Sequence, residues 1–237
     1  MKISAIIPTR SKQFSDTTKS LLSFLSSVGI NSCLPVNKSS IFEAHADGMA
    51  YHEATCSKED GSGGLEDDDI IILCHDDIRL RGSAAEFKKT LVESLSDPSI
   101  GFVGAAGTEL LTENAVWWDQ SVWKMGHHRG AVFHYDKASG REYLTEYGRP
   151  GKVLVLDGLF LAATKRTLNE VRLEKPTYLE GDWDFYDLHY TMTAHQKGLT
   201  NKVIPMNILH NSRGELVGRT SWEVNRAAFI NRFELPC

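Results

Sequence analysis

The stretch IIILCHDD, residues 70–77, decides how this sequence folds. Its apolar run, residues 70–73, is too short for a helix and is typical of a strand covered on both faces of a sheet. His75, Asp76 and Asp77 then stand at the carboxyl end of the expected strand. Adjacent carboxylates repel each other unless a cation or several donors offset their charge, and their oxygens suit Mg²⁺ or Mn²⁺. A helix or loop cap is the alternative use of this acidic pair, and the spacing favours neither.

Short apolar runs alternate with helical patterns on both sides of that strand. The sequence predicts further strands at 3–7, 30–36, 100–103, 153–156, 159–163 and near 203–204, and helices between Ser15 and Gly29, at 41–54, around 87–95 and at 184–197. This alternation is typical of an α/β fold with a mostly parallel sheet, whose ligands bind beyond the carboxyl ends of the strands. Residues 105–150 have a weak period, and we expect irregular structure that lines a pocket.

Composition limits the classes of protein that the chain can represent. The 237 residues suffice for a single domain, and 26 Lys and Arg against 31 Asp and Glu give a formal charge of −5, which argues against a nucleic-acid partner. No apolar run approaches the roughly 20 residues of a transmembrane helix, and the N-terminus is unlike a secretory signal, so we expect a cytoplasmic protein. The four cysteines are scattered without ligand spacing, which predicts neither a disulfide framework nor a zinc site.

Three other places in the sequence carry residues suited to chemistry. Residues 179–189 hold four carboxylates, of which Asp182 or Asp184 could cap a helix or act as a general base. His210 follows an apolar run, a position that is more often structural than metal-binding. Trp117 and Trp118 could stack on sugar rings or cover the core. No dinucleotide-binding glycine motif, phosphate-binding loop or nucleophile elbow is present.

The order of these motifs resembles the GT-A glycosyltransferases of the family 2 type. The segments that carry the resemblance are IIPTR, SIFEAHADGMAYHEA, IIILCHDDI, IGFVGAAGTELL, VLDGLFLAATKRTL, FYDLHYTMTAHQKGL and VIPMNILHNSRG. The match is closest to the small glycosyltransferase-like branch in which an HQD-type motif stands in for DxD. The resemblance covers residues 1–214 and implies a single GT-A domain, with 215–237 as a helical tail that packs on the core or covers the site.

The resemblance also implies roles for individual residues. On the nucleotide side, it places Pro8, Thr9 and Arg10 along the nucleotide, Asn37 and Ser39 beside the base and ribose, and Asp76 on the ribose or metal. It places Asp77 and His210 on Mn²⁺ or Mg²⁺. It places Asp157 and Gly158 in the donor-sugar and acceptor pocket, and Trp117 and Trp118 on the acceptor side. Asp187 is the first choice for the catalytic base, with Asp184 and Asp182 behind it. Three positions depart from the family pattern: Ala46, His189 and Thr193 replace an expected Asn, acid and Arg.

The implied reaction is metal-dependent transfer of a hexose from a nucleoside-diphosphate sugar to a hydroxyl of a glycan or glycoconjugate, with inversion. UDP-glucose and UDP-galactose are the expected donors, and polysaccharide biosynthesis is the expected setting. A sugar nucleotidyltransferase is the first alternative, although the loop after the first strand lacks the glycines which that class carries. A carbohydrate-binding protein that keeps the fold without transfer is the second.

Overall fold

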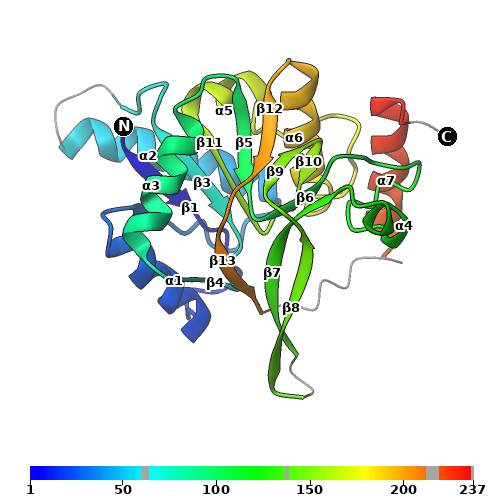
Figure 1. Cartoon of the computed structure of the whole chain (residues 1–237). Coiled ribbons are helices and arrows are strands. Elements are labelled where there is room, and N and C mark those ends of the chain that lie inside the picture. The colour runs from blue at the N-terminus through cyan, green and yellow to red at the C-terminus, as the bar shows by residue number, and fades with distance from the viewer. Residues whose placement is uncertain (60–63, 137–138, 212–218, 236–237) are drawn as a thin grey trace.

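A computed structural model describes residues 1–59, 64–136, 139–211 and 219–235 of the chain. Residues 215–218, the start of the expected tail, lie outside the described residues. The strands are β1 (Ile3–Ile6), β2 (Asn31–Cys33), β3 (Ile70–Cys74), β4 (Ile78–Arg81), β5 (Ile100–Gly104), β6 (Ala106–Thr108), β7 (His128–Asp136), β8 (Arg141–Gly148), β9 (Gly151–Val153), β10 (Val155–Leu156), β11 (Phe160–Thr164), β12 (Thr200–Val203) and β13 (Asn207–His210). The helices are α1 (Asp16–Ser26), α2 (Ile41–Glu59), α3 (Ala84–Leu95), α4 (Gln120–Lys124), α5 (Lys165–Val171), α6 (Tyr186–Gln196) and α7 (Thr220–Phe233) (Figure 1).

The central sheet of the described chain has the strand order β2-β1-β3-β11-β5-β12-β9. Strands β2, β1, β3, β5 and β12 run in one direction, but β11 lies antiparallel between β3 and β5, and β9 is antiparallel to β12. The sheet is therefore mostly parallel, as the sequence predicts, but it is mixed rather than purely parallel. Sequence periodicity cannot show this difference, because β11 is as fully buried as its parallel neighbours and carries the same kind of apolar run.

A second, six-stranded sheet has the order β10-β6-β7-β13-β4, with β8 paired to β7. Much of it comes from residues 105–150, so the expectation of irregular structure there is wrong: this segment forms β6, α4 and the long hairpin β7–β8, which projects below the body in Figure 1. The residues of β8 are exposed or only partly buried. A strand that buries neither face does not show the alternation of apolar and polar residues typical of half-buried strands, and this explains the weak hydrophobic periodicity of β8.

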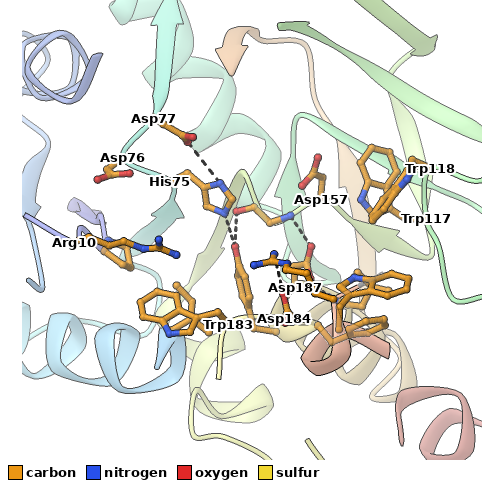
Figure 2. Close-up of a pocket in the computed structure, with 18 of the residues that line it drawn as sticks. Arg10, His75, Asp76, Asp77, Trp117, Trp118, Asp157, Trp183, Asp184 and Asp187 are labelled. Atoms are coloured by element: carbon orange, nitrogen blue, oxygen red, sulfur yellow. Dashed lines mark hydrogen bonds and ion pairs between the residues drawn. The ribbon is translucent and has the colours of Figure 1, made fainter. Parts of the chain in front are cut away.

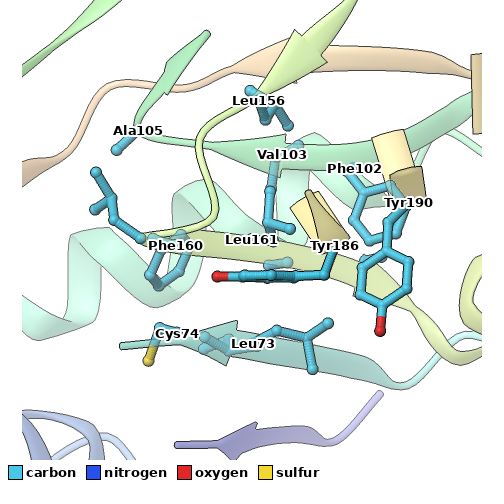
Figure 3. Packing of buried hydrophobic residues seen from close by; sticks show 14 of the residues in the cluster. Leu73, Cys74, Phe102, Val103, Ala105, Leu156, Phe160, Leu161, Tyr186 and Tyr190 are labelled. Atoms are coloured by element: carbon cyan, nitrogen blue, oxygen red, sulfur yellow. The ribbon is translucent and has the colours of Figure 1, made fainter. Parts of the chain in front are cut away.

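Part of the hydrophobic core fills the space between the central sheet and α6. All five residues of β3 are buried, as its continuous apolar run predicts. Phe102 of β5 and Tyr190 of α6 stack with ring centroids 6.4 Å apart, and both are fully buried (Figure 3). The apolar strand β3 therefore ends in the interior of the molecule, and the polar residues that follow it emerge beside the packed face of α6.

Several element boundaries differ from those that the sequence predicts. The second strand covers only Asn31–Cys33 of the expected 30–36. The expected strand 153–156 is two short strands, β9 and β10, which belong to different sheets. The late helix begins at Tyr186 rather than 184, because Phe185 has a left-handed backbone (φ 66°) that ends the preceding loop. Ser15 caps α1 as expected, accepting a hydrogen bond from the backbone N–H of Thr18.

The C-terminal helix α7 is tied to the loop that precedes α6. Asn225 is fully buried, and its side-chain oxygen accepts hydrogen bonds from the backbone N–H groups of Glu180 (3.0 Å) and Gly181 (2.8 Å). Its amide nitrogen donates to the carbonyl oxygens of Gly181 and Asp184. One side chain thus satisfies four backbone groups of this loop.

Among the described residues, no helix has the length and apolar character needed to cross a lipid bilayer.

Replacing Asn225 tests how much this attachment stabilises the fold. Asn225→Ala leaves the two N–H groups of Glu180 and Gly181 without their acceptor, and we expect it to lower the free energy of unfolding by about 2–4 kcal/mol. Urea denaturation measures the loss. Asn114→Ala is the matched control, because Asn114 is exposed and bonds only the side chain of Asp119. Equal effects of the two substitutions would contradict this account of α7.

Candidate active site

A cavity of 480 Å³ lies beyond the carboxyl ends of β1 and β3, between the two sheets, α6 and α7. Figure 2 shows its acidic, basic and aromatic side chains directed into one space. The lining residues are Pro8, Thr9, Arg10, Ile41, His75, Asp76, Asp77, Ala115, Trp117, Trp118, Asp157, Gly158, Trp183, Asp184, Phe185, Tyr186, Asp187, Leu188, Arg219 and Trp222. The carboxyl-end rule for α/β sheets therefore locates this cavity correctly.

One end of the cavity holds a group of three residues whose ligand atoms lie within 4.8 Å of one another: His75, Asp77 and His210. The Oδ1 atom of Asp77 is 3.8 Å from Nδ1 of His75 and 3.4 Å from Nε2 of His210. Strand pairing explains why His210 is there. Strand β4 begins directly after Asp77, β13 is antiparallel to it, and the register sets His210 opposite Ile78.

The electrostatics of this group suit a cation. Burial raises the pKa of Asp77, but contact with His210 and the charge of His75 outweigh it, so the pKa of Asp77 is lowered overall. Burial conversely lowers the pKa of His210, and the carboxylate of Asp77 outweighs that effect and raises it. Oδ1 of Asp77 and Nε2 of His210 are buried without a hydrogen-bond partner in the described chain. Two buried, unsatisfied ligand atoms side by side fit a divalent metal ion.

The opposite side of the cavity is formed by the start of α6 and the turn at Asp157 and Gly158. The backbone N–H of Gly158 donates to Oδ2 of Asp187 (2.9 Å), and the N–H of Leu159 donates to Oδ1 of Asp157 (3.1 Å). Burial and the nearby charge of Asp157 raise the pKa of Asp187 to about 7. Burial is also the main cause of the raised pKa of Asp157. Two neighbouring carboxyls with raised pKa values are typical of proton-transfer sites.

Packing against α7 fixes the start of α6. Phe185, whose backbone is left-handed, is 4% exposed and its ring lies 5.3 Å from that of Trp222 and 5.5 Å from that of Phe229. A left-handed backbone at a bulky residue costs about 1–3 kcal/mol and persists only where surrounding contacts hold it. The next two residues, Tyr186 and Asp187, both line the cavity. The contacts of α7 therefore determine where these two side chains point.

Tryptophans line the side of the cavity nearest α7. Trp117 and Trp118 meet edge to face with ring centroids 5.8 Å apart, and Trp118 lies 6.4 Å from Trp222. Arg219, just before α7, lies 3.6 Å from the carboxylate of Asp184, whose other oxygen accepts a hydrogen bond from Ser221. The rings of Trp117, Trp118 and Trp222 offer flat apolar faces, which pack well against the C–H faces of sugars.

Four residues that the resemblance places in the site do not line the cavity. Asn37 and Ser39 lie in the loop after β2, where Ser39 bonds Glu43 and its carbonyl oxygen accepts a hydrogen bond from the indole of Trp183. Asp182 is exposed and forms an ion pair with Lys175 (2.7 Å). His210 also lies outside the lining, but its Nε2 atom is 3.4 Å from Oδ1 of Asp77, which does line the cavity. The remaining expected residues, Pro8 to Arg10, Asp76, Asp77, Trp117, Trp118, Asp157, Gly158, Asp184 and Asp187, all line it.

Sequence reasoning missed several lining residues. His75 belongs to the three-residue group, and its place in the HDD motif was the available signal. Trp183, which directly follows Asp182, also lines the cavity and is drawn on the same side as Arg10 in Figure 2. Arg219 and Trp222 come from the tail that was expected to pack on the core or cover the site, but no pattern singled out these two residues. His189, which replaces an expected acid, bonds the hydroxyl of Tyr178 (2.8 Å) instead.

The fold and the site together define a class of protein, the GT-A glycosyltransferases. The structure of GalNAc-T7 with UDP, GalNAc and Mn²⁺ is similar, with a TM-score of 0.57 and 10% identity over 98% of this chain and 48% of that one. The structure of A197 from STIV is also similar, with a TM-score of 0.50 and 12% identity over 90% of this chain and 86% of that one. At these identities the likeness shows the fold.

Sequence comparison gives the family. Residues 63–230 match the family described as "Glycosyltransferase like family", and the chain belongs to it, as a GT-A glycosyltransferase of the family 2 type. The streptomycin biosynthesis protein StrF of Streptomyces griseus is 26% identical over 143 residues, which are 60% of this chain and 42% of StrF. The aligned part therefore spans less than half the length of that relative.

Proposed function

We propose that this protein transfers a hexose from a nucleoside-diphosphate sugar to a hydroxyl group of a glycan or glycoconjugate, in a metal-dependent reaction. The observation that carries the proposal is the arrangement of the cavity, with a metal-ligating group at one end and a carboxyl of raised pKa, Asp187, at the other. Family membership over residues 63–230 supports the reaction class, and that range includes both groups.

Asp77 and His210 would hold Mn²⁺, our first choice, or Mg²⁺. When bound there, the ion supplies positive charge that stabilises the leaving diphosphate. Arg10 adds a guanidinium at the same side of the cavity, and Trp183 adds a flat ring beside it (Figure 2). We propose that Pro8, Thr9 and Arg10 lie along the nucleotide, with Asn37 and Ser39 at its outer edge and Asp76 near the ribose.

Asp187 is the proposed general base. Its carboxylate takes the proton of the acceptor hydroxyl as the oxygen attacks the anomeric carbon, while the bond from that carbon to the diphosphate breaks and its electron pair leaves with the diphosphate. A carboxyl with a pKa of about 7 is matched to this task, because it is largely ionised just above neutral pH and still basic enough to accept a proton. Attack opposite to the leaving group inverts the anomeric centre.

Trp117 and Trp118 provide the proposed acceptor side, joined by Trp222 of α7. A glycan acceptor suits this wall, because the rings offer apolar faces while Asp157 and Asp184 offer acceptors for hydroxyl groups. We expect the reaction to occur in the cytoplasm during polysaccharide biosynthesis. Among the described residues, Cys33 and Cys74 are free thiols, which fits a reducing compartment.

A nucleotide panel tests the proposal. Thermal shifts with UDP, GDP, dTDP and CDP, each with and without Mn²⁺, identify the nucleotide, and we expect the largest stabilisation from UDP with Mn²⁺ because ligands that bind only the folded state raise the melting temperature. Incubation with UDP-glucose and UDP-galactose should then release UDP. Release of pyrophosphate from a sugar phosphate and a nucleoside triphosphate would instead indicate a nucleotidyltransferase, and binding without release would indicate a carbohydrate-binding protein.

A further inference from the structure

Tyr186 stands between the two ends of the cavity and contacts both. Its hydroxyl donates a hydrogen bond to the carbonyl oxygen of Gly158 (3.0 Å) and lies 2.9 Å from Nε2 of His75. A phenol carries a single proton, and a carbonyl oxygen only accepts. Both contacts are hydrogen bonds only when the phenol donates to Gly158 and Nε2 of His75 donates to the phenol oxygen. The hydrogen-bond network therefore assigns the tautomer of His75.

An imidazole that carries its proton on Nε2 has its lone pair on Nδ1. Nδ1 of His75 is the atom that lies 3.8 Å from Oδ1 of Asp77, on the side of the ring that faces the metal-ligating group. The other tautomer would direct an N–H group at a metal ion in this position. The contact with Tyr186 thus leaves His75 with its free lone pair at the place where a third ligand is needed.

We propose that Tyr186 is a positioning residue that fixes the tautomer of His75, so that Nδ1 of His75 becomes a third metal ligand beside Asp77 and His210. The inference rests on the proposed function, because it assumes a metal at this group. Outer partners of this kind orient metal-binding histidines in many proteins. A set of two imidazole nitrogens and one carboxylate favours Mn²⁺ and its transition-metal neighbours over Mg²⁺, which prefers oxygen ligands.

The same peptide links the metal-ligating group to the proposed base. The carbonyl oxygen of Gly158 accepts the proton of Tyr186, while its N–H donates to Asp187. A side chain at this glycine would overlap the hydroxyl of Tyr186 and come within 2.9 Å of Cβ of Asp187. The close approach permitted by Gly158 therefore joins His75, Tyr186 and Asp187 into one hydrogen-bonded unit.

Substitution of Tyr186 by Phe, which removes only the hydroxyl, is the test. Titration with Mn²⁺ alone, followed by the electron paramagnetic resonance of the free ion, should show an affinity about 10-fold to 100-fold weaker in Tyr186→Phe than in the wild type. Tyr190→Phe is a matched control. Tyr190 lies on the same helix, and its hydroxyl likewise contacts a carbonyl oxygen, of Leu173, and a histidine, His45, which is not a member of the metal-ligating group. Its Mn²⁺ affinity should equal that of the wild type.

A second measurement does not depend on any variant. Long-range ¹H–¹⁵N correlation spectra of the metal-free wild-type protein report which nitrogen of His75 carries the proton, and we expect Nε2. A proton on Nδ1, or Mn²⁺ binding that Tyr186→Phe leaves unchanged, would overturn the inference. Equal weakening in Tyr190→Phe would overturn it as well. None of these readouts requires a nucleotide sugar, so failure of the proposed transfer reaction is detected separately, by the absence of UDP release.

Discussion

Asp187→Asn is expected to lower the rate of hexose transfer by about 10²-fold to 10⁴-fold, the usual contribution of a general base. The amide is close in size to the carboxylate, and its oxygen can still accept the N–H of Gly158, so the variant should bind UDP and Mn²⁺ as the wild type does. Single-turnover kinetics with the donor identified by the nucleotide panel measure the loss. Full transfer by Asp187→Asn would show that another group is the base.

The raised pKa of Asp187 gives this prediction a pH dependence with a definite sign. Transfer requires the ionised carboxylate, so kcat/KM should climb as pH rises through about 7 and then level off. Folding stability should change in the opposite direction. The folded state keeps the proton of Asp187 up to about pH 7, whereas the unfolded chain releases it near the ordinary aspartate pKa of about 3.9. Protonated Asp187 therefore contributes stability that is fully present below about pH 3.9. This contribution is lost as the pH rises through about 7.

Comparing the wild type with Asp187→Asn isolates the contribution of Asp187 to the pH dependence of folding stability. The difference in free energy of unfolding between wild type and Asp187→Asn should shift in favour of the variant between about pH 5 and about pH 8, as measured by urea denaturation. Asp182→Asn is the matched control, because Asp182 is exposed and paired with Lys175 outside the cavity. It should retain both the transfer rate and the pH profile of the wild type.

Asp77→Asn should abolish the dependence of nucleotide binding on Mn²⁺. The carboxylate of Asp77 is the charged member of the three-residue group, and its Oδ1 lies near the ligand nitrogens of both histidines. An amide oxygen is a much weaker ligand for a divalent cation, so calorimetric titration with UDP should give the same affinity with and without Mn²⁺. The rate of hexose transfer should also fall in Asp77→Asn, because the diphosphate would leave without the positive charge that stabilises it.

Asp76→Asn is the neighbouring comparison for this experiment. Asp76 lines the cavity but does not belong to the three-residue group. We expect the Asp76 variant to keep its affinity for Mn²⁺ alone and to bind the nucleotide more weakly. If Asp76→Asn lost Mn²⁺ binding and Asp77→Asn kept it, the assignment of the two aspartates would be reversed.

The fold class and the location of the site could be predicted from local sequence patterns. Residues 70–77 contain both the buried strand β3 and the polar group at its end, and residue types at this spacing suffice to indicate each. The order of motifs along the chain then identified the GT-A class and selected Asp77, Asp157 and Asp187, which the structure brings to one cavity. Those predictions depend on interactions within a few residues or on the order of segments.

Features that depend on pairing between distant segments could not be predicted in this way. The contact of His210 with Asp77 follows from the register of β13 on β4, and no local pattern encodes that register. The antiparallel insertion of β11 has the same origin. The left-handed backbone of Phe185 is held by rings of α7 from a later part of the chain, which is why the predicted start of the late helix was two residues too early.

The attachment of α7 also has an evolutionary consequence. One continuous helix supplies Trp222 to the proposed acceptor side, while the metal-ligating group and the strand ends beside the nucleotide belong to other elements. Substitutions in α7 are therefore expected to act on the proposed acceptor side and, through the packing of Phe185, on the position of Tyr186 and Asp187 as well. We expect exchange of α7 between family members to change acceptor preference and transfer rate together, because one helix contacts both parts of the cavity.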